Sequence, residues 1–560
     1  LERVIGEIHT IQGEYEGIGV KFNPRKSTAL TVARKGSERW GRLEELTKPL
    51  GITLRSTSVR TLGFSIGEKA HIEEGLRAQL GKYEADMRLK DHFRSEQDQF
   101  AVFSHCLSAT ARASHLARAT HPTVGCEAFR KLDDAAARTV IEIAGAEEGY
   151  IEGATLERAK KMALLPGEFG GVGRGRVGGV RRTTQYVQGL HPTLEHFKGD
   201  SPGFLEAVAE RRGGGGLEAR VLVVEPPEGG PRGPWGGHEV GRVPLSSIKW
   251  EEKELLPLDV EGSPTTDRKA TLKVLREATR HEDITIITIA LEEMRSPANK
   301  DFISAASVLS GATSVAAMFL RYVGGPIWGR EHIEGQAFAH ALRYRLLLPP
   351  IIGSPDGVTH NLQPCNCKDC PPFASNQRRP HRALYGKCFQ GQQDDRHDRV
   401  RDLCARHLSA IGPTKIEQRV ADGQSGRRRC DVECWGAVFE GRGVRVMLDV
   451  AVTTPTTPAR AERAAFHAGL EAAKAERAKF DKYWKKAHPN RQVPPEGTRT
   501  GGLVPVALET GGLLGGEAVR WLQKVFKREP ELLQAFYREL SFLRARKVGE
   551  TLWMGAGVPE

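Results

Sequence analysis

The C-terminal part of the sequence contains residues whose types and order could support metal-dependent cleavage of a phosphodiester. They are a histidine, two aspartates, and a group of lysines with a tyrosine. His397 stands at a predicted helix, Asp431 at the start of a predicted strand and Asp449 within the next strand. An alanine-rich stretch then carries the basic and phenolic candidates Lys479, Lys482 and Tyr483. Two carboxylates can hold Mg²⁺ or Mn²⁺ that activates water, while a lysine stabilises the charge developing on the phosphate.

Hydrophobic periodicity predicts the elements that must position these residues. One face of a strand over 444–452 collects the aliphatic residues Val444, Val446, Leu448, Val450 and Val452. Successive strand residues point to opposite sides, so Asp449 points away from that face. From His397 onward apolar residues recur at helical spacing, which places His397 on the first turn of a helix. A helix over about 459–487 and a final strand from Leu503 complete the segment.

Each of these residues also has an ordinary structural interpretation. A single strand aspartate is usually solvent-facing, and lysines on an alanine-rich helix usually form a solvated face. The ordered series favours the catalytic interpretation over these alternatives. We expect Lys482 to lie beside the scissile phosphate, with Lys479, one helical turn earlier, as the alternative.

A cluster of cysteines and a histidine precedes this segment. It contains the five potential zinc ligands Cys365, Cys367, Cys370, His381 and Cys388. Zn²⁺ prefers four tetrahedral nitrogen and sulfur ligands, and closely spaced cysteines let one turn supply two thiolates. Cys367 and Cys370 with His381 and Cys388 form one set, and Cys365 could replace either of the first two. The alternative is a set of reduced loop thiols. Three later cysteines are predicted to be buried free thiols, namely Cys404, Cys430 and Cys434.

The overall composition indicates which classes of binding partner suit the protein. The 560 residues carry a net charge of +12 with a pI of about 9.2, which suits a polyanionic partner. No apolar run approaches the ~18 residues of a membrane span, and no signal-peptide pattern is found. Because the sequence starts at Leu1 inside a helical pattern, we expect a fragment whose N-terminus lies upstream.

The N-terminal part predicts an α+β region followed by helices. We expect a first helix over residues 1–15, strands over 20–23, 28–32 and 59–66, and a helix over 39–49. Residues 70–150 follow a helical pattern whose stripe contains Leu76, Leu80, Tyr83 and Met87. Glycine and proline are dense over 166–240, which indicates a linker or a surface insertion. Helices are predicted to resume between about 300 and 347.

These segments resemble the C-terminal part of a polyprotein from site-specific non-LTR retrotransposons. Asn23-Pro-Arg-Lys-Ser27 resembles a reverse transcriptase segment whose lysine lies near the incoming nucleotide, and Lys26 matches that lysine. Leu62-Gly63 resembles the primer grip. The Cys/His cluster, an Arg-His pair, an Arg-x-Asp, a strand aspartate and a Lys-Tyr on a helix resemble the knuckle and restriction-like endonuclease of these elements. The family often has proline where this chain has Cys430.

The resemblance implies an α+β multidomain chain with a PD-(D/E)XK-like α/β endonuclease domain at its C-terminal end. The implied parts are the end of the reverse transcriptase palm (1–68), a thumb-like helical region (69–165), a linker or insertion (166–300), a helical connector (301–363), a zinc knuckle (364–393) and the endonuclease (394–545).

The resemblance also implies the activity and the partners. The intact element would nick its target DNA in the nucleus and prime reverse transcription of its RNA from the new end. The polymerase aspartates of the family would precede Leu1, so we expect no polymerisation from this chain. One alternative is a catalytically dead remnant that only binds nucleic acid, and another is an unrelated cellular resolvase-like nuclease. We expect no membrane association, and the pattern leaves the oligomeric state open.

Overall fold

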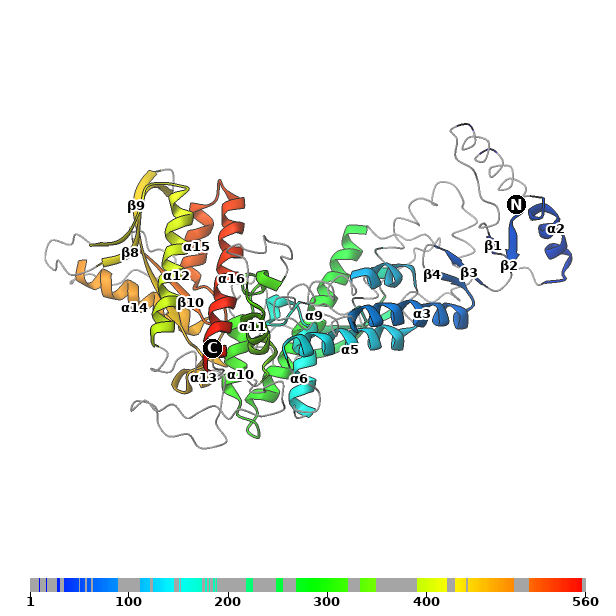
Figure 1. Ribbon diagram of the computed structural model, residues 1–560, viewed down its shortest axis with the longest axis horizontal. Helices are drawn as coiled ribbons and strands as arrows, with labels where there is room; N and C mark the ends of the chain where they lie inside the picture. The colour runs from blue at the N-terminus through cyan, green and yellow to red at the C-terminus, as the bar shows by residue number, and fades with distance from the viewer. Residues whose placement is uncertain are drawn as a thin grey trace. The chain divides into compact units, whose positions relative to one another are not determined.

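A computed structural model describes the protein over several separate ranges. These are mainly parts of 28–88, then 111–120, 124–145, 153–173, 268–320, 333–348, 390–419, 429–439, 442–487 and 503–555, with the backbone of 218–224 and 248–254. Within these ranges helices and strands are mixed, as an α+β protein requires (Figure 1). The chain divides into two compact units, the first comprising 1–86, 109–133 and 177–211 and the second comprising the rest.

The first unit contains short strands and amphipathic helices. Strands β1 (Thr28–Leu30) and β2 (Thr53–Arg55) pair in parallel, and helix α2 (Glu38–Thr47) lies between them in sequence. Ser37 caps this helix by accepting a hydrogen bond from the Trp40 N–H. Helix α3 (Lys69–Arg88), whose last two residues fall in the second unit, buries the predicted stripe of Leu76, Leu80, Tyr83 and Met87, as its spacing requires.

The second unit is built around a mixed four-stranded sheet with the order β10-β9-β8-β7. Strands β7 (Thr414–Arg419), β8 (Arg429–Phe439) and β9 (Arg442–Thr453) pair antiparallel in sequence order. Strand β10 (Leu503–Glu509) then joins β9 in parallel. Helices α13 (Pro458–Ala464) and α14 (Leu470–Ala487) lie in the connection from β9 to β10, because two parallel strands need a crossover.

The main core lies on one face of this sheet. Helices α12 (Gln390–Ser409), α15 (Gly516–Val525) and α16 (Pro530–Gly555) stand side by side against it (Figure 1). Their apolar residues meet the alternate strand residues Val432, Cys434, Val446, Leu448 and Val450. Cys404, Cys430 and Cys434 are buried free thiols, which confirms that prediction. The opposite face of the sheet therefore remains for Asp449 and its neighbours.

A group of connector helices belongs to the same unit. It comprises α9 (Arg268–Arg295), α10 (Phe302–Gly311), the 3₁₀ helix η7 (Val315–Leu320) and α11 (Gly335–Leu346). Helix α16 contacts both α11 and η7, and α10 contacts α13. Helices were predicted to resume at about 300, but α9 begins at Arg268. The buried residues of α9 recur at helical spacing, and they include Ile284, Ile287, Leu291 and Met294. The prediction placed this segment in the linker because it follows a stretch rich in glycine.

Two sequence predictions in the first unit have different outcomes. The helix predicted over 39–49 is confirmed as α2. The single strand predicted over 59–66 is wrong, because it is two short strands, β3 (Ser58–Thr61) and β4 (Phe64–Gly67), paired antiparallel. Thr61 stands opposite Phe64, so the chain reverses direction between them. The helix predicted over 1–15, the strand over 20–23 and Lys26 lie outside the described residues, apart from Thr10.

Element boundaries in the second unit also differ from the sequence predictions. Helix α12 begins at Gln390, so its first turn lies inside the predicted zinc knuckle and His397 stands two turns into the helix rather than on its first turn. The long helix predicted over 459–487 is divided into α13 and α14. Gly469 makes the division with a φ of +71°, and a side chain there would meet Leu513. The predicted end at 545 falls inside the continuous helix α16.

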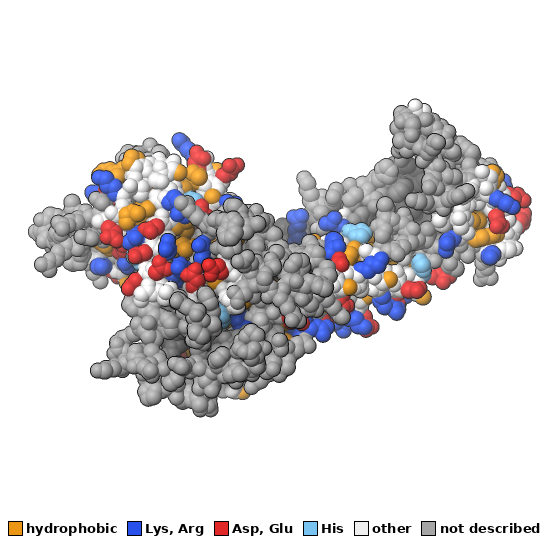
Figure 2. Space-filling model, in the orientation of Figure 1, with side chains coloured by type: hydrophobic (Ala, Val, Ile, Leu, Met, Phe, Trp, Pro, Cys, Tyr) orange, Lys and Arg blue, Asp and Glu red, His pale blue; other side chains and the backbone are white. Residues whose placement is uncertain are grey.

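Among the described residues, no helix has the length and apolar character needed to cross a membrane. On the face shown in Figure 2, acidic and basic side chains are interspersed over the described surface.

Candidate active site

Asp431 and Asp449 come together because strands β8 and β9 are antiparallel neighbours. Val432 pairs with Leu448, so the next residues along, Asp431 and Asp449, stand opposite each other. Side chains of directly opposed residues have Cβ atoms roughly 4.5–5.5 Å apart. Both aspartates belong to the alternate set that points away from the main core, as predicted for Asp449. The sheet thus places two carboxylates side by side.

Asp431 is held by a backbone amide and a histidine. Its Oδ2 accepts a hydrogen bond of 2.6 Å from the Val450 N–H and lies 3.3 Å from His397 Nε2. Burial disfavours the charged carboxylate, but the hydrogen bonds from His397 and Val450 outweigh it, and the pKa of Asp431 lies below its usual range. Asp431 is therefore an anion with a fixed orientation.

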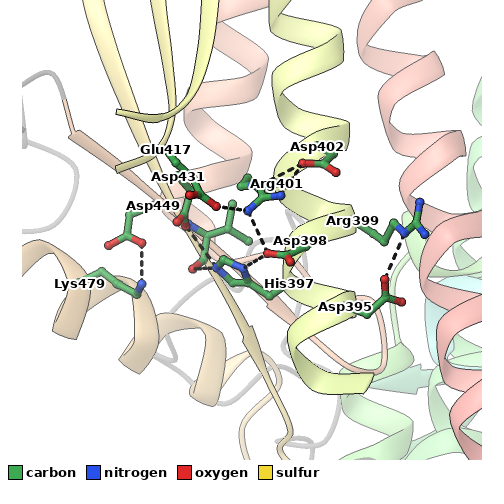
Figure 3. A network of polar contacts seen from close by, with 11 residues as sticks. Asp395, His397, Asp398, Arg399, Arg401, Asp402, Glu417, Asp431, Asp449 and Lys479 are labelled. Carbon is green, nitrogen blue, oxygen red and sulfur yellow. Dashed lines mark hydrogen bonds and ion pairs between the residues drawn. The ribbon is translucent and has the colours of Figure 1, made fainter. Parts of the chain in front are cut away.

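Asp449 is more deeply buried and less completely satisfied. Its Oδ1 lies 2.5 Å from the Lys479 ammonium (Figure 3). Its Oδ2 is buried and has no hydrogen-bond partner among the described residues. Burial raises the pKa of Asp449, the neighbouring charge of Asp431 raises it further, and Lys479 only partly opposes this. A buried oxygen without a protein partner is a position that a water molecule or a ligand can complete.

Helix α14 presents two of its three candidates to the acid pair. Lys479 reaches Asp449, whereas Lys482 is exposed and its ammonium lies 5.6 Å from the ring centre of Tyr483. Burial raises the pKa of the Tyr483 phenol, and the charges of Asp449 and Asp431 raise it further. The Tyr483 phenol therefore lies near both carboxylates, and the alternative lysine of the sequence analysis is the one that the fold places at the acid pair.

His397 connects the acid pair to a charged network on α12. Its Nε2 lies 3.2 Å from the Val450 carbonyl oxygen, and its Nδ1 lies 3.4 Å from Asp398. The hydrogen bond with Asp431 raises the pKa of His397, although burial opposes this. Arg401 in turn bonds Asp398 at 3.0 Å and Glu417 at 2.6 Å (Figure 3).

Several members of this arrangement were not predicted from the sequence. Asp398 and Arg401 are among them, although their spacing of three residues is typical of an ion pair on a helix. The Val450 amide and carbonyl are the others, and no sequence pattern could reveal them because they depend on strand register.

The remaining predicted site residues cannot be placed. Lys26 and the whole Cys/His cluster lie outside the described residues, the latter comprising Cys365, Cys367, Cys370, His381 and Cys388. Among the residues that the structure describes, no group of three or more His, Cys, Asp or Glu side chains is arranged to hold a metal ion. The acid pair offers two carboxylates.

Comparison with known proteins adds no family to this picture. No protein-family model matches the chain, and no curated protein matches its sequence.

Proposed function

We propose that the sheet of the second unit and its helices form a metal-dependent DNA endonuclease of the restriction-like, PD-(D/E)XK type. The observation that supports this best is the opposition of Asp431 and Asp449 across β8 and β9, with Lys479 on one Asp449 oxygen and no hydrogen-bond partner among the described residues on the other. A structural ion pair needs no second carboxylate at the same position. Two like charges this close are costly, and the cost falls when one carboxyl is protonated or when a cation lies between them.

The donor set fits Mg²⁺ or Mn²⁺. Mg²⁺ is commonly held by one or two carboxylates and keeps several water ligands, so the pair of Asp431 and Asp449 is sufficient. The buried Oδ2 of Asp449 has no hydrogen-bond donor among the residues that the structure describes, and a cation can satisfy such an atom. When bound, the metal would supply an activated water and screen the charge of the phosphate.

Each side chain then has a distinct role. His397 and the Val450 amide hold the Asp431 carboxylate in one orientation. Lys479 keeps the raised pKa of Asp449 from rising further and places a positive charge where negative charge develops on the phosphate. Tyr483 lies beside the same carboxylate and can orient water or a phosphate oxygen through its hydroxyl.

The resemblance in the sequence supports a wider proposal, that the chain is part of a non-LTR retrotransposon polyprotein. The endonuclease would nick target DNA in the nucleus, and the element RNA would be the template for the polymerase of the element. The zinc knuckle remains part of this proposal. Elemental analysis of protein purified without chelators should then find about one Zn²⁺ per chain.

Nicking of supercoiled plasmid DNA tests the endonuclease directly. The wild-type chain should convert it to the relaxed form in Mg²⁺ or Mn²⁺ and not in EDTA. Asp431→Ala should lose the activity and retain DNA binding, because the net charge of +12 does not depend on the metal. A wild-type chain that binds DNA and cuts it with neither metal would contradict the proposal and favour a remnant that only binds nucleic acid.

A further inference from the structure

An exposed tryptophan lies on the same face of the sheet as the proposed catalytic acids. Trp435 of β8 is 45% exposed, which is unusual for so large an aromatic side chain. Residues 431, 433 and 435 alternate along β8 and therefore share the face that carries Asp431. On β9 the corresponding alternation runs from Asp449 to Arg445. At about 3.3 Å per residue, Trp435 stands roughly 13 Å along the strand from Asp431.

A β-bulge at Trp435 sets the direction of this side chain. The regular pairing of β8 with β9 shifts between Cys434 and Ala437, so Trp435 and Gly436 together oppose the single residue Arg445. Such bulges redirect a side chain and are frequent beside active sites.

The backbone of Trp435 is fixed although its ring is exposed. Its N–H donates to the Pro413 carbonyl at 2.9 Å. Gly412 approaches the Trp435 carbonyl so closely that a Cβ at residue 412 would lie 2.0 Å from that oxygen. The ring is thus presented from an anchored strand and loses little freedom when it binds a partner.

A positive charge is fixed on one side of the ring. The Arg445 guanidinium lies 4.9 Å from the centre of the Trp435 ring. Arg445 is held there by an ion pair with Glu433, which is buried. Lys415, exposed on β7, pairs in register with Glu433 and adds a second cation to the same face. Aromatic stacking beside fixed cations is typical of surfaces that bind single-stranded nucleic acid.

We infer that Trp435 and Arg445 form a platform for an unpaired base of the DNA strand that is cut. The base stacks on the Trp435 ring, and Arg445 and Lys415 contact the neighbouring phosphates. A base inside a continuous duplex already has stacked neighbours on both faces, so the platform selects locally unpaired DNA. With a rise of about 3.4 Å per nucleotide, ~13 Å places the stacked base within about four nucleotides of the scissile phosphate. This position rests on the proposed nuclease function, whereas binding of an unpaired base does not.

Binding measured without a divalent metal separates the two proposals. Fluorescence anisotropy in EDTA would compare the full chain with three labelled DNAs, namely a single strand, a duplex with a central unpaired segment, and a continuous duplex. Trp435→Ala should weaken binding of the first two by roughly 5- to 100-fold, on the general scale of one lost base stack. Its affinity for the continuous duplex should stay within about twofold, and Trp435→Phe should recover most of the loss.

The chain offers a matched control in Phe466. Its ring is 42% exposed and also has an arginine, Arg295, at 4.9 Å from its centre, but it is not on the sheet. Phe466→Ala should bind all three DNAs like the wild type. Equal binding by Trp435→Ala and wild type, an equal loss on the continuous duplex, or the same loss in Phe466→Ala would each overturn the platform.

Photocrosslinking locates the base. With 5-iodouracil at successive positions of the cut strand, Trp435 should crosslink most strongly within about four nucleotides of the nick, and a crosslink only at distant positions would overturn the placement. If unpaired DNA depends on Trp435 but no metal supports nicking, the nuclease proposal fails and the platform stands. If nicking depends on Asp431 but Trp435→Ala binds unpaired DNA like the wild type, the platform fails and the nuclease proposal stands.

Discussion

Arg345 and Asp449 are both buried charges in the same unit, but their surroundings differ. Arg345, on α11, donates to carbonyl oxygens of Gly167, Gly171, Gly311 and Ala316 at 2.7–3.4 Å. These acceptors join separate segments around one guanidinium. Asp449 has Lys479 on one oxygen and no described partner on the other. A charge surrounded by fixed partners holds a fold together, whereas an incompletely satisfied charge is available for chemistry.

The largest expected effect follows from removing the charge of Asp449. Asp449→Asn should lower the nicking rate by at least about a thousandfold, because the metal loses an anionic ligand. The free energy of unfolding should change by no more than about 1 kcal/mol, because the Asn carboxamide oxygen still accepts from Lys479 and the repulsion between residues 449 and 431 is removed. Plasmid nicking and urea denaturation measure the two quantities. A variant that unfolds readily would show that Asp449 is structural.

Arg345→Ala should give the opposite result. It leaves several buried carbonyls without a donor, so the free energy of unfolding should fall by about 3–5 kcal/mol. The nicking rate per folded molecule should stay near that of the wild type. Arg399→Ala is the matched control, because Arg399 is an exposed arginine on α12 whose ion pair with Asp395 contributes little. Equal stability of the two variants in urea would remove the distinction between the two buried charges.

The two lysines of α14 sharpen the comparison at the acid pair itself. Lys479→Ala should slow nicking by about 10²-fold, the scale of losing one charge contact in the transition state. Lys482→Ala should slow it less than about threefold, because that side chain is exposed and lies against Tyr483. Single-turnover rates at saturating metal measure both. A larger loss in Lys482→Ala would return the catalytic role to the lysine favoured by the sequence.

Substitution of Glu509 should produce the smallest effect, a change in how the stability of the fold depends on pH. Burial raises its pKa to about 7, although the N–H groups of Glu471 and Ala472 donate to its Oε1 at the start of α14. The folded state then holds a proton that the unfolded chain releases near its usual value of 4.5, so stability should fall as pH rises from about 4.5 to 7. Glu509→Gln keeps the accepting oxygen and should reduce that fall by about 1–3 kcal/mol.

Glu476 provides the contrast for this experiment. Its pKa is also raised to about 7 by burial, but its two oxygens accept from two different N–H groups, those of Glu517 and Ala518. Glu476→Gln therefore loses one acceptor and should cost stability at low pH, where Glu509→Gln costs little. Thermal unfolding between pH 4.5 and 8 distinguishes them. An identical pH slope in Glu509→Gln and wild type would show that Glu509 does not carry the dependence.

The sequence by itself determined the features that depend on local periodicity. Alternation along 444–452 predicted that Leu448 and Val450 enter the core and that Asp449 points away. Helical spacing predicted the buried stripe of α3 in the same way. These predictions succeed because burial of one face follows from the repeat of the element, whatever it packs against.

Only the tertiary structure decided which of several residues with similar sequence patterns come into contact. Lys479 and Lys482 are about one turn apart, and the rotation of α14 on the sheet determines which reaches Asp449. A side chain at Gly469 would meet Leu513, and two of the partners of Arg345, Gly167 and Gly171, lie more than a hundred residues away in the sequence. Such contacts are set by the packing of distant elements, so no local pattern in the sequence records them.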